Sequence, residues 1–157
     1  MIEVPYLAAF NLTRAFLPKM LARRSGAIAC ITSPASYIVW PNACAYTAAR
    51  HALAGFTEAL RAEVRGTGLS VTLVVLGLVE SPYWEHNPRS REHAPEMNPM
   101  IAPALSPDEA AEAIFAGVEK RKRMVVKPAI FRALFLLNAI APRLVASQVR
   151  SAVPKQS

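Results

Sequence analysis

The sequence predicts an α/β fold in which about three parallel strands are flanked by helices. Two continuous apolar runs, 27–32 and 69–78, have the length and composition of strands that are covered on both faces. Each run follows a longer segment whose apolar residues recur at helical spacing, so helix and strand alternate along the chain. This alternation favours parallel strands that are joined by helical crossovers.

The size and composition of the chain are typical of one packed domain. The chain has 157 residues, of which 53% are hydrophobic and 18% are charged. Such a length can bury about two thirds of the unfolded surface around a single core, and the low share of charge argues against general disorder. We therefore expect one domain over residues 1–151 and a flexible tail over residues 152–157.

The N-terminal half contains the two longest predicted helices. Apolar periodicity indicates a helix over residues 4–24, which Pro18 bends and Gly26 ends. A second helix is predicted over residues 43–64. It has one apolar stripe, and its other face is lined by small alanines at positions 45, 48 and 52.

The C-terminal half is less regular. Five prolines interrupt residues 82–103, so we expect a lid or a binding loop there. The residues Ser106-Pro-Asp-Glu109 form a capping box that starts the next helix, and residues 124–126 are predicted as a short last strand. The apolar and basic segment 129–149 leaves two alternatives: a docked C-terminal helix, which we favour, or a helix that lies on a membrane surface.

Composition argues against several classes of protein. Cys30 and Cys44 have no further ligands at metal-binding spacing, so we expect partly buried, reduced thiols in a cytoplasmic protein and no metal site. The net charge is +7, with a basic cluster at 120–123, but no aromatic residues alternate with the cluster, so no nucleic-acid partner is predicted. The acidic N-terminus is unlike a signal peptide, and the prolines in the uncharged stretch 26–49 argue against a membrane-spanning helix.

Three side chains form a candidate catalytic group. Tyr46 and Arg50 lie four residues apart on a predicted helix and therefore share one face. Ser33 follows the first strand, and ligands bind at the carboxyl ends of strands in a parallel sheet. A phenol titrates near pH ~10 and needs a neighbouring cation to act as an acid or base near neutrality. Tyrosine and arginine at this spacing are also common on exposed helices, so spacing alone leaves an ordinary surface pair open.

The run from Gly26 to Ser81 resembles the second half of a short-chain dehydrogenase/reductase. In that family a strand ends in two hydroxyl residues, a tyrosine follows thirteen positions after the second, a lysine ends the small-residue stretch, and a later strand leads to Pro-Gly-x-Val-x-Thr. The segment VPYLAAFNLTRAFLPKM resembles the helix that precedes this run. The resemblance implies a Rossmann-like, doubly wound parallel sheet that is truncated to about three strands with flanking helices.

The resemblance also implies an activity and a set of site residues. It implies an NAD(P)-dependent oxidoreductase that interconverts a small-molecule alcohol and a ketone by hydride transfer. Ser33 would bind the substrate oxygen, Tyr46 would donate or accept the proton, and Arg50 would stand in place of the lysine. The remaining implied positions are the cofactor-binding residues Tyr46, Arg50, Gly77, Val79 and Ser81, and the substrate-pocket residues Ser33, Tyr37 and Trp84. His86 and His93 lie in the lid, where solvated histidines are expected.

Several positions of the sequence depart from the family pattern. Arginine is larger and more planar than lysine, so Arg50 is not a neutral exchange. Pro5, Ser36 and Leu76 replace a common asparagine, glycine and proline. No Gly-rich pyrophosphate turn is present in the 157 residues, so binding of NAD or NADP is expected to be compromised. The alternative is an inactive fragment that pairs with itself or with a relative through helices 4–24 and 43–64.

Overall fold

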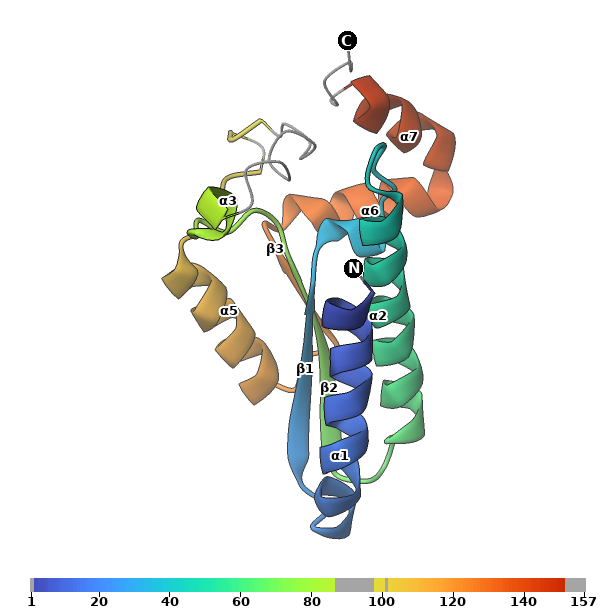
Figure 1. Ribbon diagram of the computed structural model, residues 1–157, viewed down its shortest axis with the longest axis vertical. Coiled ribbons are helices and arrows are strands. Elements are labelled where there is room, and N and C mark those ends of the chain that lie inside the picture. Colours follow the sequence, from blue (N-terminus) through green and yellow to red (C-terminus); the bar gives the residue numbers. More distant parts are fainter. Residues whose placement is uncertain (1, 87–97, 101, 152–157) are drawn as a thin grey trace.

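A computed structural model describes residues 2–86, 98–100 and 102–151 (Figure 1). Positions such as His93 and the predicted tail 152–157 lie outside the described residues. The elements follow the order η1 (Glu3–Leu7), α1 (Ala8–Ala22), β1 (Gly26–Thr32), η2 (Pro34–Ser36), α2 (Cys44–Glu63), β2 (Leu69–Leu76), α3 (Tyr83–His86), α5 (Pro107–Glu119), β3 (Met124–Lys127), α6 (Ile130–Ile140) and α7 (Pro142–Ser151).

The three strands form one parallel sheet in the order β1-β2-β3, which confirms the predicted fold class. Thr32 at the end of β1 pairs with Val75 of β2, and Leu76 at the end of β2 pairs with Lys127 of β3. The carboxyl ends of all three strands therefore lie at one edge of the sheet. β2 is buried over almost its whole length, as its continuous apolar run predicts.

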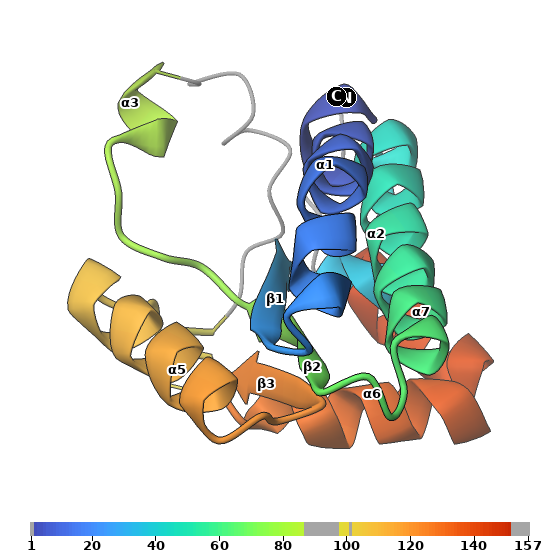
Figure 2. The same ribbon diagram turned by 90° about the horizontal axis from the view of Figure 1, so that it is seen from below.

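Helices cover both faces of the sheet (Figures 1 and 2). On one face, α1 and α2 pack over β1 and β2, and α6 packs beside α2 through Phe131. On the other face, α5 covers β2 and β3 through Ala110 and its neighbours. The chain is thus a doubly wound unit of three layers in which α2 and α5 flank the central strand β2.

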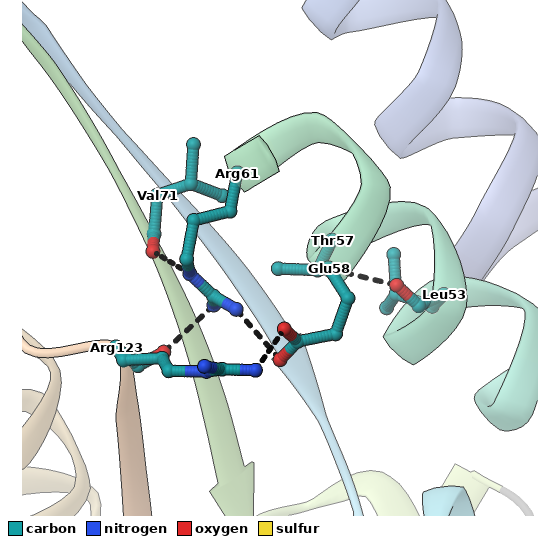
Figure 3. A network of polar contacts seen from close by, with 6 residues as sticks. All are labelled: Leu53, Thr57, Glu58, Arg61, Val71 and Arg123. Atoms are coloured by element: carbon teal, nitrogen blue, oxygen red, sulfur yellow. Dashed lines mark hydrogen bonds and ion pairs between the residues drawn. The ribbon is translucent and has the colours of Figure 1, made fainter. Parts of the chain in front are cut away.

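Arg61 ties helix α2 to the sheet (Figure 3). Its Nε donates to the carbonyl of Val71 in β2 (2.9 Å), and its Nη2 donates to the carbonyl of Arg123 just before β3 (2.8 Å). Glu58 lies 2.6 Å from both Arg61 Nη1 and Arg123 Nη2. The charge of the Arg61 guanidinium is balanced by the ion pair with Glu58. The network sits where the strands begin, away from their carboxyl ends.

Two predicted helices match the structure closely at their starts. The capping box is present, since Ser106 Oγ accepts from the Glu109 amide (3.1 Å) and Glu109 Oε2 accepts from the Ser106 amide (2.8 Å). The predicted helix 4–24 corresponds to a short π-helical turn, Glu3–Leu7, that continues into α1. Both starts follow from local sequence.

Two expectations differ from the structure. The segment 129–149 is two helices rather than one, because Pro142 has no amide hydrogen to continue α6 and starts α7 instead. Cys30 is buried as expected, and burial raises the pKa of its thiol. Cys44 is exposed rather than partly buried, because it occupies the first, outward-facing position of α2.

Candidate active site

Tyr46 and Arg50 lie together on the first turns of α2. The guanidinium carbon of Arg50 is 4.7 Å from the centroid of the Tyr46 ring. The structure therefore brings the phenol and the cation into contact, as their spacing predicts. Arg50 lies over the face of the ring, and its Nε is buried without a hydrogen-bond partner among the described residues.

A hydroxyl network fixes the loop after β1 against this part of α2. Ser36 Oγ donates to the backbone carbonyl of Arg50 (3.0 Å) and lies 2.6 Å from Thr32 Oγ1. Because Ser36 has one hydroxyl proton and gives it to the carbonyl, Thr32 is the donor in the second bond. Both hydroxyl residues are buried. The loop that carries Ser33 is thereby held beside the helix turn that carries Arg50.

Ser33 caps the short helix η2 and keeps a proton for a ligand. Its Oγ accepts from the Ala35 amide at 3.2 Å, and its side chain is half-buried. A hydroxyl has one proton and two lone pairs, so accepting this bond leaves the proton free to bind an oxygen. Ser33 follows the carboxyl end of β1, which is the edge of the sheet where ligands bind in parallel α/β folds.

The segment after β2 reaches the same edge of the sheet. Because Thr32 pairs with Val75, Ser33 and Leu76 leave the two strands at the same level, and Gly77 follows directly. The Gly77 amide donates to the carbonyl of Lys127 (2.8 Å). A Cβ at Gly77 would come within 3.0 Å of both the Phe131 ring and Pro128, so a side chain there would force the neighbouring groups apart.

Val79 and Ser81 differ in their surroundings. Val79 is half-buried and forms a parallel bridge with Leu105, with hydrogen bonds on either side of it. Ser81 is exposed, and its Oγ accepts from the Tyr83 amide at 3.4 Å. The structure thus leaves Ser81 more accessible to a ligand than Val79.

The structure packs the aromatic ring of Tyr37 inward. This ring lies 4.7 Å from that of Phe135 in α6, and Asn138 Nδ2 donates to the Tyr37 carbonyl (2.8 Å). Burial raises the pKa of Tyr37, and the negative charge of Glu58 raises it further. Tyr37 therefore joins the loop after β1 to α6. Trp84 belongs to α3, but its side chain is outside the described part of the structure, and His86 is exposed at the end of the same helix.

Sequence reasoning missed the role of Thr32 and Ser36. Ser36 stood out only as a replacement for glycine, whereas the structure uses it to connect β1 to α2. The spacing of two hydroxyl residues four positions apart at the end of a strand was the signal that could have indicated it. In the described part of the chain, no three His, Cys, Asp or Glu side chains are grouped so that they could hold a metal ion.

Residues 1–92 match the family model for short chain dehydrogenases. The dehydrogenase/reductase SDR family member 7B of Bos taurus is 32% identical over 161 residues, which cover 95% of this chain and 48% of that protein. The estradiol 17-beta-dehydrogenase 11 of Macaca fascicularis is 29% identical over 143 residues, which cover 89% of this chain and 44% of that protein. The chain spans about half the length of the curated relatives that it matches.

Solved structures agree with the fold. A short chain dehydrogenase from Burkholderia cenocepacia J2315 in complex with NADP has a TM-score of 0.76 at 22% identity, covering 94% of this chain and 56% of that chain. A short-chain dehydrogenase from Sphingobium yanoikuyae in complex with NADPH has a TM-score of 0.71 at 19% identity, and the match covers 99% of this chain and 58% of that chain. The match of the family model to more than half of these residues shows that the chain belongs to the short-chain dehydrogenase/reductase family.

Proposed function

We propose that this chain carries the catalytic half of an NAD(P)-dependent oxidoreductase that interconverts a small-molecule alcohol and a ketone. The observation that carries the proposal is the coupling of β1 to α2: Ser36 binds the carbonyl of Arg50 while Arg50 lies on the Tyr46 ring. We expect this coupling to hold Ser33, Tyr46 and Arg50 in one region at the carboxyl edge of the sheet, where the family places its chemistry.

Each of the three residues has a distinct task in this reaction. Ser33 donates its hydroxyl proton in a hydrogen bond to the substrate oxygen and fixes its position. Tyr46 gives its phenolic proton to that oxygen when a ketone is reduced, and takes the proton back when an alcohol is oxidised. Arg50 keeps a positive charge against the ring that becomes negative when the proton leaves.

The described residues fit the nicotinamide end of the cofactor. Arg50 Nε is a buried donor that lacks a partner among the described residues, so a shift of the side chain toward an acceptor oxygen of the cofactor would give it a charge-assisted hydrogen bond. Gly77, Val79 and Ser81 follow β2 at the same edge and would lie along the nicotinamide. The nicotinamide supplies or accepts the hydride when bound. NAD and NADP remain equal candidates, because these residues do not touch the part in which the two cofactors differ.

An interaction module is the second candidate function. An open groove of 380 Å³ lies between α1 and α2, and much of its lining is apolar, including Phe10, Leu17, Leu21, Phe56 and Leu60. The groove touches none of the three proposed catalytic residues. In this second proposal, the chain, which spans about half the length of its relatives, uses this surface to pair with a second copy or with a relative.

Cofactor titration separates the two functions. NADH and NADPH are titrated against the purified 157-residue chain while nicotinamide fluorescence is followed, and reduction of a panel of ketones is then measured. The enzyme proposal expects saturable binding and turnover, with Tyr46→Phe lowering kcat about 100-fold or more while cofactor binding persists. The absence of binding at the highest cofactor concentrations would reject the enzyme proposal and favour the interaction module.

A pair of Arg50 variants tests whether the positive charge at position 50 takes part in the reaction. Arg50→Lys keeps the charge and removes the buried Nε, so we expect it to retain or increase turnover. Arg50→Met keeps much of the apolar stem but removes the charge, so it should lose turnover to the same extent as Tyr46→Phe. Equal activity of both variants would show that the charge of residue 50 has no part in the reaction.

We also assign the chain to the cytoplasm, on the strength of its free thiols. Cys30 is buried and Cys44 is exposed, and neither is paired. Unpaired cysteines are the rule in reducing compartments. Fractionation of cells that express the tagged chain tests this location. A non-reducing gel of the same fractions shows whether Cys44 forms a disulfide-linked dimer, which a reducing compartment would prevent.

A further inference from the structure

Helix α6 is apolar except for Arg132 and Asn138, although only one side of it packs against the protein. Phe131, Leu134 and Phe135 face the core beneath β2 and β3. On the opposite side, Leu136 is 64% exposed and Ile140 is 75% exposed. A helix that is apolar on all sides is ordinarily buried. The outer side of α6 therefore has the composition of a buried surface, but no other described element of the chain packs against it.

The exposed residues of α6 form one continuous face. Its large members are Ile130, Leu136, Leu137 and Ile140: Ile140 follows Leu137 and Leu136 by three and four residues, and Ile130 precedes them by about two helical turns. Leu144 of α7 is also exposed. The helix has two polar residues, and one of them, Asn138, points inward and donates to the Tyr37 carbonyl (2.8 Å). The other, Arg132, is exposed. Arg132 is therefore the one exposed polar side chain of α6, beside a face of large apolar residues.

This face is remote from the other uncovered part of the sheet. β1 is one edge strand of the sheet, and its Ile31 is 48% exposed; β3 is the other edge strand, and α6 packs beside it (Figures 1 and 2). A partner that extended the sheet beyond β1 would lie on the far side of β2 from β3. It would leave the outer face of α6 exposed, so this face needs an occupant of its own.

The charge around α6 and α7 indicates what that occupant is. All 11 Asp and Glu residues of the chain precede position 120, whereas residues 120–157 contain nine Lys and Arg residues and no Asp or Glu. On the two helices themselves, Arg132, Arg143 and Arg150 are exposed. A second copy docked face to face would bring these cations together, which is unfavourable. An anionic lipid surface offers both apolar chains and negative charge.

We propose that α6 and α7 bind the surface of an anionic lipid bilayer. The outer face of α6 enters the boundary between headgroups and acyl chains, and Arg132, Arg143 and Arg150 contact the phosphates. The 11 residues of α6 rise only about 16 Å, so the helix lies in the plane of the surface. In agreement, none of the helices in the described part of the chain is long and apolar enough to cross a membrane. This binding does not depend on whether the chain turns over a substrate.

Sedimentation with vesicles tests the proposal. The full chain is mixed with vesicles of phosphatidylcholine alone or of phosphatidylcholine with phosphatidylserine. We expect binding to the anionic vesicles that weakens as salt is added. The double variant Leu136→Gln and Ile140→Gln should weaken the partition coefficient at least about tenfold. Replacement of Arg132 and Arg143 by Gln should weaken it roughly fivefold per arginine.

A matched control separates this face from general exposure of apolar groups. Phe115 on α5 is 70% exposed, so Phe115→Gln removes an equally exposed apolar side chain from another surface and should leave vesicle binding unchanged. Circular dichroism verifies that each variant is folded. Absence of binding to anionic vesicles, equal binding to neutral ones, or an equal loss in Phe115→Gln would overturn the proposal. So would a lipid-free dimer that the α6 variant converts to a monomer, because the face would then belong to a second copy.

Discussion

At the scale of single residues, Ser33 and Ser36 have the same chemistry and different surroundings. Ser36 is buried, and its hydroxyl joins Thr32 to the carbonyl of Arg50. Ser33 is half-buried and uses its oxygen only to cap a short helix among the described contacts. The two residues lie three positions apart, so they provide a matched pair in which stability and activity are expected to separate.

We predict that Ser36→Ala mainly lowers stability, whereas Ser33→Ala mainly lowers activity. Ser36→Ala leaves the buried Thr32 hydroxyl without its acceptor and removes the second hydrogen bond to the Arg50 carbonyl, which keeps its bond within α2, so it should lower the free energy of unfolding by about 1–3 kcal/mol. Ser33→Ala should cost about 1 kcal/mol or less but should abolish most of the proposed ketone reduction. Urea unfolding and steady-state kinetics measure the two effects. If Ser33→Ala reduced ketones normally, Ser33 would have no substrate role.

The Arg50 side chain shows what replacement of lysine changes. Its guanidinium rests on the Tyr46 ring, and its Nε is trapped without a partner. A lysine has a methylene group at this point of the side chain, which needs no hydrogen bond. The trapped donor costs about 1–3 kcal/mol, and the attraction of the half-buried cation to the ring offsets about 0.5–2 kcal/mol of this cost.

At the scale of elements, the Glu58 network decides how α2 sits on the sheet. Burial raises the pKa of Glu58, but the hydrogen bond and the charge of Arg61, together with Arg123, outweigh burial and lower the pKa below its ordinary value of 4.5. The ionised carboxylate is therefore favoured by the folded state. Its contribution to stability is complete above pH 4.5 and is lost as the pH falls through the lower, folded pKa.

We predict that Glu58→Gln flattens the pH dependence of stability. The wild-type chain should lose free energy of unfolding below pH 4.5 more steeply than the variant. The difference between the two at neutral pH should be roughly 1 kcal/mol or less, because about a third of the Glu58 side chain is exposed and solvent screens the pair. Urea unfolding at a series of pH values measures it. Glu63→Gln on the same helix is the control, and parallel curves for wild type and Glu58→Gln would contradict the prediction.

At the scale of the whole molecule, two surfaces besides the outer face of α6 are open in the described part of the chain. β1 is an edge strand, and its side chains at 27, 29 and 31 are exposed on the side of the sheet that α5 covers only in part. The groove between α1 and α2 is open as well. Both features agree with a chain that spans about half the length of its relatives.

The open groove between α1 and α2 predicts self-association of the chain through these two helices. We predict that the chain forms a dimer and that the double variant Phe10→Gln and Leu21→Gln shifts it to the monomer, because both side chains line the groove. Light scattering after size-exclusion chromatography measures the mass, and Phe115→Gln on α5 is again the control. A wild-type chain that is monomeric at all concentrations would contradict this prediction.

Much of the fold was predictable because it depends on local periodicity. The apolar runs located all three strands within about two residues, and the capping box located the start of α5. The break between α6 and α7 was missed although Pro142 signals it, because the apolar pattern continues across the proline. Of the candidate site, the contact of Tyr46 with Arg50 followed from helical spacing, whereas the roles of Ser33, Gly77, Val79 and Ser81 stay predictions.

The sequence by itself determined the α/β class, the order of the elements and the family, because periodicity and motif spacing are properties of the chain. Only the tertiary structure decided how Ser36 couples β1 to α2, that the Tyr37 ring packs on α6, and that one side of α6 is left uncovered. The physical reason is that these features depend on residues distant in sequence: Tyr37 and Asn138 meet across 101 positions. No local pattern encodes which face of a helix will find a partner.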